Sequence, residues 1–407
     1  MLSPISAAIR RGKTQLALAI FCLHIEHEEP IVDFDRAIRL SCLYLNYDVI
    51  SLLLGLYNDS PHMCLGRPQT GQDMKALLSE LLFDIVAAPT GSFIIELERR
   101  LLYGTGYQIA YKATLEFLVD EGAISMPDSV DLRLLRVALR HDDLIAVKTL
   151  VEHLERSNKD TVYYLRNLGS DHQDAGAVGF HEPALIMCMA FGSITVFEYL
   201  VQRFPSLSLY TPGDYGAMPI LHTACSLDNG TPFVKTLLLR CGANVTLYDG
   251  RGSNAIYVAL LNGQSKSADA IASYCESEKL RELLGPDAKG WSVSCRLLSA
   301  WRHHRSLDII ESFQWLARKN ALDKTGPLGA PSWTAILEPS RPFSAADQRL
   351  DVQLLRLVLG GGELNQKMID NEIWGYKTLL SFAAMNGHIE VVRLLLDSGA
   401  DPMLGYS

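Results

Sequence analysis

Apolar residues recur with the period of a helix in short stretches of this chain, most clearly over residues 376–407. Apolar residues follow one helix face over 379–385 and cover most of 389–396, with Asn386-Gly387-His388 between the two stretches. Gly399 then follows, and glycine can adopt the left-handed conformation that ends a helix without a Cβ penalty. The pattern predicts two short helices, 379–385 and 389–396, joined by a tight turn.

These two helices carry more apolar surface than a single hairpin can bury, so we expect them to stack on copies of themselves. A small residue before the turn between the helices marks the phase of each copy. The marker recurs at a spacing of about 33 residues, with some longer gaps. The copies are marked by Ala8, Ser41, Gly106, Ala138, Cys188, Ala224, Ala259, Ala300, Ala346 and Ala383, and a further degenerate copy is predicted near Met74–Val86.

The segment YKTLLSFAAMNGHIEVVRLLLDSGAD closely resembles the ankyrin repeat. Residues 216–262, which contain ILHTACS and VKTLLLRCGAN, resemble it as well. The resemblance implies an all-α, ankyrin-type helix-turn-helix solenoid of about ten or eleven irregular repeats with short β-turn tips. Its members bind a protein or peptide partner on a concave face made of inner helices and tips. His222 stands at the histidine of the family's TPLH motif, where it is expected to brace the turn between repeats.

Three parts are predicted along the chain: degenerate repeats over 1–125, central repeats over 126–285 and C-terminal repeats over 286–407. The central part contains an insertion at 155–182, and the C-terminal part contains a proline-rich insertion at 321–342. Because proline cannot continue a helix, we expect the second insertion to be extended. Long loops in compact arrays often carry function.

The resemblance also predicts which residues contact a partner, at the tips and along the inner helices. The predicted tip residues are Asp214, Tyr215, Tyr248, Asp249, Arg251, Asp370, Trp374 and Tyr376. Exposed positions on the inner helices are expected at Thr223, Val258, Phe382 and Met385. Such a rigid surface loses little entropy on binding, which suits recognition without catalysis. The predicted function is therefore a module for protein–protein interaction.

An enzyme on an ankyrin-repeat frame is the alternative, either an acid–base cyclase or an isomerase, of the kind found in specialised metabolism. Imidazole beside carboxylate is the minimum apparatus for proton transfer. His141 is followed by two aspartates at a turn, and the irregular loop beyond adds Asp171, His172 and His181. Turns also favour aspartate for its hydrogen bonds to the backbone. A purely structural scaffold is a third hypothesis.

Two further motifs suggest cofactors, but neither is complete. Gly12-Lys13-Thr14 resembles the end of a phosphate-binding loop, but Ala7 replaces the first glycine and no strand precedes it, so we predict a turn between helices. His24 and His27, with Glu28, have metal-ligand spacing but lack a third ligand in sequence. We therefore predict no cofactor and no metal.

Composition narrows the compartment and the partners. The eight cysteines form no CxxC pair, which favours reduced thiols and an intracellular location, cytoplasmic or nuclear. The net charge of −9 is a poor match for nucleic acid, which needs a basic stripe. No apolar run reaches 18 residues, so no membrane span is predicted. Apolar surface at the end of the array leaves self-association open.

Overall fold

The structure is a computed structural model, which describes the chain except at residues 1–3, 28–30, 32–33, 61, 63, 66, 92–105, 121–128, 158–159, 169–182, 208–217, 288–289, 304, 323–333, 338–344, 360–377 and 405–407. The chain divides into two compact units, Met1–Leu207 and Ser208–Ser407. This division falls inside the middle one of the three parts expected from sequence, and the three-part division stays a prediction.

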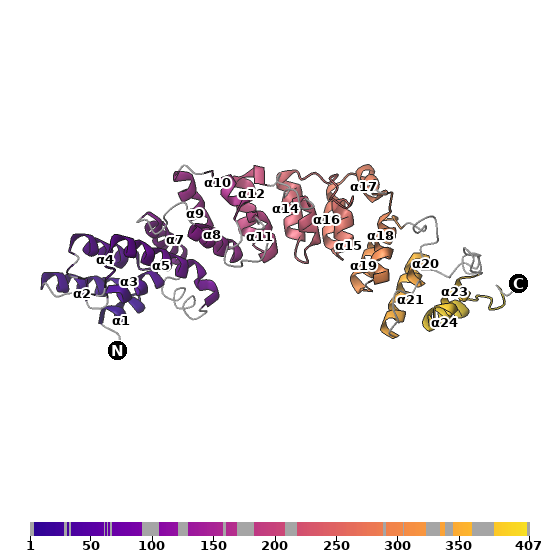
Figure 1. Ribbon diagram of the computed structural model, residues 1–407, viewed down its shortest axis with the longest axis horizontal. Coiled ribbons are helices and arrows are strands. Elements are labelled where there is room, and N and C mark those ends of the chain that lie inside the picture. Colours follow the sequence, from indigo (N-terminus) through magenta and orange to yellow (C-terminus); the bar gives the residue numbers. More distant parts are fainter. Residues whose placement is uncertain are drawn as a thin grey trace. The chain divides into compact units, whose positions relative to one another are not determined.

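Unit 1 is built of helices that pack in consecutive pairs (Figure 1). The described residues of unit 1 form five pairs, α1 with α2, α3 with α4, α5 with α7, α8 with α9, and α11 with α12. The first helix of each pair packs on the first helix of the next pair, and the second helices do the same. The helices are α1 (Pro4–Arg10), α2 (Thr14–Glu26), α3 (Phe34–Leu43), α4 (Tyr47–Asp59), α5 (Gly71–Gly91), α7 (Tyr107–Leu118), α8 (Ser129–Arg140), α9 (Leu144–Arg156), α10 (Thr161–Arg166), α11 (Ala184–Phe191), α12 (Ile194–Arg203) and the 3-10 helix η4 (Pro205–Leu207).

Unit 2 also consists of such pairs, α13/α14, α15/α16, α18/α19, α20/α21 and α23/α24 (Figure 1). Its first helices pack on one another from α13 to α20, and its second helices pack on one another from α14 to α24. The additional helix α17 lies between the second and third pairs in sequence and packs on α15, as α10 packs on α9 in unit 1. The helices are α13 (Ile220–Ser226), α14 (Thr231–Cys241), α15 (Ala255–Leu261), α16 (Ser265–Tyr274), α17 (Ser277–Leu284), α18 (Val293–His303), α19 (Leu307–Arg318), α20 (Thr334–Leu337), α21 (Ala345–Leu359), α23 (Leu379–Met385) and α24 (Ile389–Asp397).

One turn geometry recurs between the helices of a pair. In six pairs the residue two places before the second helix has a positive φ, and these residues are Gly12, Leu45, Asp142, Gly192, Gly263 and Gly387. The next residue donates its backbone N–H to the carbonyl of the marker residue five places earlier. For example, Asp143 donates to Ala138 at 3.0 Å, and His388 donates to Ala383 at 3.0 Å. This turn confirms that Gly12-Lys13 connects two helices.

Apolar burial holds each pair to its neighbours. In α23 and α24, Leu379, Ala383, Val391 and Leu395 are fully buried. Burial of one such large aliphatic side chain contributes about 1.5–3 kcal/mol. The predicted helices 379–385 and 389–396 are confirmed within one residue. The described residues contain helices and a single isolated β-bridge, Ile31 with Cys64, which confirms the all-α fold class.

The predicted phase was wrong in the third pair of unit 1. Met74–Val86 lies within α5, and Gly106 directly precedes α7. Because α5 and α7 pack on each other as first and second helix, they form one repeat where the sequence suggested two. The additional chain length lies inside this pair, between its helices, whereas a constant period assumes that length is added between repeats.

The prediction was also wrong for the fourth pair of unit 2. The proline-rich stretch 321–342 was expected to be extended, but it contains α20, whose Ile336 and Leu337 are fully buried. No proline falls between Pro331 and Pro339, and this gap is long enough for one helical turn. Ala346 consequently lies at the start of the second helix, α21, and does not end the first helix.

Candidate functional site

The tip between α14 and α15 is held in shape by the side chain of Asp249. Its Oδ1 atom accepts hydrogen bonds from the backbone N–H groups of Arg251, at 2.9 Å, and Ser253, at 2.8 Å. The backbone N–H of Asp249 also donates to the carbonyl of Ser253 at 2.9 Å. Gly252, with φ of 85°, allows the chain to reverse here. The tip is therefore closed by its own bonds, and Tyr248 and Arg251 remain exposed.

His222, at the start of α13, braces this tip through a hydrogen bond, as its position in the repeat predicted. Its ring is fully buried, and Nε2 lies 3.1 Å from the carbonyl oxygen of Ser253. Burial lowers the pKa of His222, so the ring is neutral near pH 7 and donates from Nε2. The histidine therefore connects the first helix of one pair to the tip that leads into the next.

The next tip, before α18, is built in the same way. Asp287 donates its backbone N–H to the carbonyl of Trp291 at 2.8 Å and accepts the N–H of Trp291 at its own Oδ1 atom, at 2.9 Å. The second carboxylate oxygen of Asp287 accepts from Nε of Arg296 at 2.8 Å. Tyr257 donates its hydroxyl to the carbonyl of Gly285 at 2.6 Å. Buried polar contacts thus fix this tip from both sides.

The two tips lie side by side, because Nη2 of Arg296 is 3.5 Å from the carbonyl oxygen of Arg251. The guanidinium of Arg296 also covers the ring of Trp291 at 5.4 Å from the ring centroid. Trp291 is 37% exposed and Tyr248 is 48% exposed. We call Tyr248, Arg251, Trp291 and Arg296 the tip surface. Aromatic residues and arginine are the types that dominate binding energy at protein interfaces.

The predicted partner-binding residues fall into two groups. Tyr248 and Arg251 belong to the tip surface, and Asp249 shapes the tip with its carboxylate. Asp214, Tyr215, Asp370, Trp374 and Tyr376 lie outside the described residues. Trp291 and Arg296 were missed, although the sequence offered a signal: Asp-x-Arg-Gly at 249–252 returns as Asp-x-Lys-Gly at 287–290.

The inner-helix positions were predicted less well. Met385 is exposed, as predicted, whereas Thr223 is half-buried and so less exposed than predicted. Val258 and Phe382 are buried, so the prediction of exposure was wrong for both. For Val258 the reason is its helix: α13, α16, α17 and α18 all pack on α15.

The residues of the acid–base alternative are only partly described. Asp171, His172 and His181 lie outside the described residues. His141 is half-buried, and its pKa is lowered by burial and by Arg140. Both neighbouring carboxylates form helix caps: Asp142 accepts from the backbone N–H of Val196 at 2.8 Å, and Asp143 accepts from that of Ala146 at 3.0 Å. Asp143 also accepts the hydroxyl of Tyr111.

A buried polar cluster in unit 2 was not predicted at all. Asp351 on α21 is fully buried, and its Oδ1 atom accepts from Nε1 of Trp301 and from Nε of Arg305, both at 2.9 Å. Its Oδ2 atom lies 3.5 Å from Nδ1 of His388. Nε2 of His388 lies 2.8 Å from the carbonyl oxygen of Leu337. The cluster therefore joins three consecutive helix pairs.

Two features of the sequence, seen in retrospect, point to this cluster. Asp351 lies on the apolar face of α21 with Leu354, Leu355 and Val358, all of which are buried. A carboxylate on such a face needs partners inside the protein. Trp301 lies six places before α19, at the marker position that a small residue occupies in the regular pairs. The prediction of Ala300 as the marker was therefore wrong by one residue. Burial raises the pKa of Asp351, while Arg305 and Trp301 act in the opposite direction.

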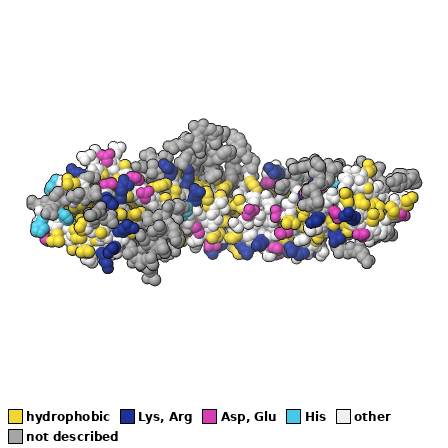
Figure 2. Space-filling view, turned by 90° about the horizontal axis from the view of Figure 1, so that it is seen from below, with side chains coloured by type: hydrophobic (Ala, Val, Ile, Leu, Met, Phe, Trp, Pro, Cys, Tyr) yellow, Lys and Arg dark blue, Asp and Glu magenta, His cyan; other side chains and the backbone are white. Residues whose placement is uncertain are grey.

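Other chemistry among the described residues is limited. They contain no group of three His, Cys, Asp or Glu side chains that could hold a metal ion. All eight cysteines are free thiols, and burial raises the pKa of Cys42, Cys188 and Cys225 well above the ordinary value. No described helix combines the length and the apolar character that a membrane crossing requires. On the face drawn in Figure 2, basic and acidic side chains are interspersed.

Comparison with known proteins gives one family match and similarity to solved structures. Residues 376–405 match the family described as ankyrin repeat. The solved structures include EF0377, an ankyrin repeat protein, at 16% identity, with a TM-score of 0.36 and coverage of 52% of this chain and 96% of that one. They also include the ankyrin repeat domain of human ASB11, at 14% identity, with a TM-score of 0.38 and coverage of 67% and 98%. No curated protein matches the chain.

Proposed function

On the premise that this chain carries an ankyrin repeat at residues 376–405, we propose that it is a protein-interaction module. We assign the contact with its protein or peptide partner to the tip surface of unit 2, formed by Tyr248, Arg251, Trp291 and Arg296. Proteins that contain this repeat generally bind other proteins, which supports the coarse assignment. The finer assignment to these four residues is the part that experiment must test.

The observation that carries the proposal is the way the two tips are held. Asp249 and Asp287 close the tips with their carboxylates, His222 and Tyr257 brace them from buried positions, and the exposed side chains project from this frame. A surface ordered before binding loses little conformational entropy when a partner arrives. Binding energy is therefore retained for the contacts themselves.

The side chains also define what the partner must offer. Arg296 is already paired with Asp287, whereas Arg251 forms no ion pair with any described residue. We therefore expect a carboxylate of the partner at Arg251 and an apolar side chain against Tyr248 or Trp291. Of the other described tryptophans, Trp301 and Trp315 are fully buried, so Trp291 alone is exposed among them. We therefore expect Trp291 to be the main aromatic contact with the partner.

Site-specific photocrosslinking tests the assignment. A photoreactive amino acid at position 248 should give a covalent adduct with a protein in native extract. The Arg251→Ala, Trp291→Ala variant, carrying the same probe, should lose that adduct by at least tenfold, because truncation of such anchors costs about 2 kcal/mol or more. An adduct with a second copy of the chain would identify self-association as the form of binding.

Matched controls come from exposed residues away from the tips. Tyr163 on α10 is 59% exposed, and Arg393 on α24 is exposed. A probe at position 163 should not give the same adduct, and Tyr163→Ala or Arg393→Ala should leave the adduct at position 248 unchanged. Equal adducts from both probe positions, or an adduct that survives the double variant, would refute the tip surface. Circular dichroism checks that each variant folds.

We also propose that the protein acts inside the cell, in the cytoplasm or nucleus. The eight free thiols support this, because oxidising compartments favour disulfides. A fluorescent fusion of the full chain, imaged together with compartment markers, tests the assignment. Signal confined to a secretory compartment would contradict it.

A further inference from the structure

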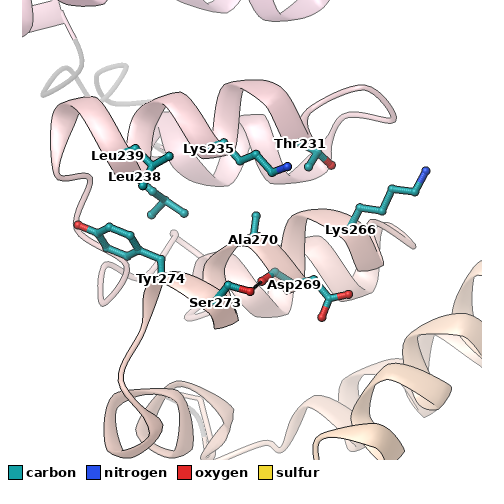
Figure 3. Close-up of a pocket in the computed structure, with 9 residues that line it drawn as sticks. All are labelled: Thr231, Lys235, Leu238, Leu239, Lys266, Asp269, Ala270, Ser273 and Tyr274. Atoms are coloured by element: carbon teal, nitrogen blue, oxygen red, sulfur yellow. Dashed lines mark hydrogen bonds between the residues drawn. The ribbon is translucent and has the colours of Figure 1, made fainter.

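A groove lies between the second helices of two neighbouring pairs in unit 2, α14 and α16 (Figure 3). Its cavity volume is about 750 Å³. The sequence of α16 explains why the space is open, since Ala270 and Ser273 stand where longer side chains would fill it. Leu238 is buried in the groove wall, and at one end Thr231 and Ser267 join the two helices through a hydrogen bond of 3.0 Å between their hydroxyl oxygens.

The groove has two chemically different ends, as Figure 3 shows. Leu238, Leu239 and Tyr274 gather at one end, and Lys235 and Lys266 lie toward the other, near Thr231. Leu239 is 75% exposed and Tyr274 is 44% exposed, so the apolar end is accessible. A ligand that fills the groove lengthwise meets an apolar and aromatic surface first and two ammonium groups afterwards.

The charge of this groove is not balanced by its own residues. Helix α14 contains no carboxylate, and Asp269 is the single acidic residue of α16. Asp269 is engaged on the side of α19, where Oδ1 accepts from Nε1 of Trp315 at 2.8 Å and lies 3.5 Å from Nζ of Lys319. Among the described residues, neither Lys235 nor Lys266 forms an ion pair with a carboxylate. The end of the groove at Lys235 and Lys266 is therefore locally cationic, although the net charge of the chain is −9.

We propose that the α14–α16 groove is a second binding site, which takes an acidic amphipathic segment of a partner protein. Carboxylates of the segment lie at Lys235 and Lys266, and an apolar side chain lies against Leu239 and Tyr274. Charge complementarity at the cationic end and the apolar end together select this occupant over a purely basic or purely apolar one. The site uses none of the residues of the tip surface, so it stands independently of the proposed function.

Unit 1 offers a matched comparison within the same chain. A groove of about 650 Å³ lies between α2 and α4, which are also second helices of neighbouring pairs. Its lining includes Leu18, Ile25 and Tyr47, but its charged groups are Asp48 and Asp59. The two grooves therefore share their place in the repeat and their apolar component, and they differ in the sign of the charge. An acidic segment should bind at α14–α16 and avoid α2–α4.

Peptide selection on the full-length chain tests the proposal. Random dodecapeptides displayed on phage are selected on the immobilised protein and counter-selected on the Lys235→Glu, Lys266→Glu variant. We expect the enriched peptides to be acidic and to carry at least one large apolar residue. Fluorescence anisotropy with an enriched synthetic peptide should show affinity at least tenfold weaker for the charge-reversal variant and for Leu239→Ser. Affinity should also fall as the salt concentration rises.

Three controls keep this test separate from the tip surface and from other ligands. Asp48→Asn, Asp59→Asn in the α2–α4 groove should leave the affinity unchanged, and so should Arg251→Ala, Trp291→Ala. Vesicles containing phosphatidylserine and single-stranded RNA are titrated against the peptide complex of the unaltered chain. Both are also titrated against the Lys235→Glu, Lys266→Glu variant. The proposal is overturned if no peptides are enriched, if enriched peptides are neutral or basic, if binding survives charge reversal, or if vesicles or RNA displace the peptide through the two lysines.

Discussion

Two junctions between helix pairs meet the same requirement with different chemistry. Between α8/α9 and α11/α12 the links are hydrogen bonds of capping groups. Ser193, the residue before α12, donates its hydroxyl to the carbonyl of Leu139 at 2.5 Å, and Asp142 accepts from backbone N–H groups at the start of α12. The second junction joins the last three pairs of unit 2. Here His388 directly precedes α24, as Ser193 precedes α12, and it contacts the carbonyl of Leu337 and faces the buried carboxylate of Asp351.

The difference shows how one repeat position can serve neutral or charged contacts. Ser193 needs one acceptor, which the preceding pair supplies through its backbone. His388 is accompanied by Asp351, and a buried carboxylate requires further donors, which Trp301 and Arg305 provide. A neutral hydrogen bond adds about 1 kcal/mol to stability, whereas loss of one member of a buried ion pair costs several times more. The charged junction is therefore the more vulnerable to single substitutions.

The largest effect is expected from Asp351→Ala. The substitution leaves the guanidinium of Arg305, whose side chain is 7% exposed, without its carboxylate. We expect the free energy of unfolding of unit 2 to fall by about 3–5 kcal/mol, because an unpaired charge stays buried. Urea unfolding with hydrogen-exchange readout on α18–α24 measures this, since repeat arrays need not unfold in one step.

The control for this substitution is Asp397→Ala, which removes an exposed carboxylate from α24 and should change stability by less than about 0.5 kcal/mol. Asp351→Leu gives a second comparison, because it also removes the partner of Arg305 but restores apolar volume. If Asp351→Ala behaves like the control, the cluster does not hold the three pairs together.

A smaller loss is expected from Ser193→Ala at the neutral junction. The buried carbonyl of Leu139 loses its side-chain donor, which should cost about 1–2 kcal/mol in the unfolding free energy of unit 1. The control is Ser273→Ala, with the unfolding free energy of unit 2 as its readout, because this exposed serine donates only within its own helix, to the carbonyl of Asp269 at 2.7 Å. Equal losses at Ser193 and Asp351 would contradict the distinction between the junctions.

The smallest effect concerns pH. Burial lowers the pKa of His141 and His153 in unit 1 and of His222 in unit 2. Below the ordinary histidine value of about 6.5, the unfolded chain binds protons that the folded chain does not, so stability falls as the pH falls. Urea midpoints at pH 7.5, 6.5 and 5.5 should decrease in that order.

The variant His222→Gln isolates one histidine of this set. Its starting stability should be lower, because the brace to the tip is weakened, but its unfolding free energy should change less between pH 7.5 and 5.5 than that of the unaltered chain. An unchanged pH dependence in this variant would contradict the lowered pKa of His222.

The local pattern of the chain was sufficient for the regular pairs. Turn residues such as Gly387, with the apolar stripes on either side, predicted α23 and α24 almost to the residue, because helix boundaries depend on nearby hydrogen bonds and burial. The brace by His222 and the exposure of Tyr248 and Arg251 at the tip also followed from position in the repeat. These features depend on residues close together in one or two repeats.

The irregular pairs and the distant contacts depended on the tertiary structure. The sequence alone determined that short helices must stack, but only the packing decided that α5 pairs with α7 and that α20 belongs before α21. Packing likewise brought Trp301 and Arg305 to Asp351, and Arg296 to the tip of Arg251. The physical reason is that insertion lengths do not specify which helix faces meet, whereas burial of the apolar faces does.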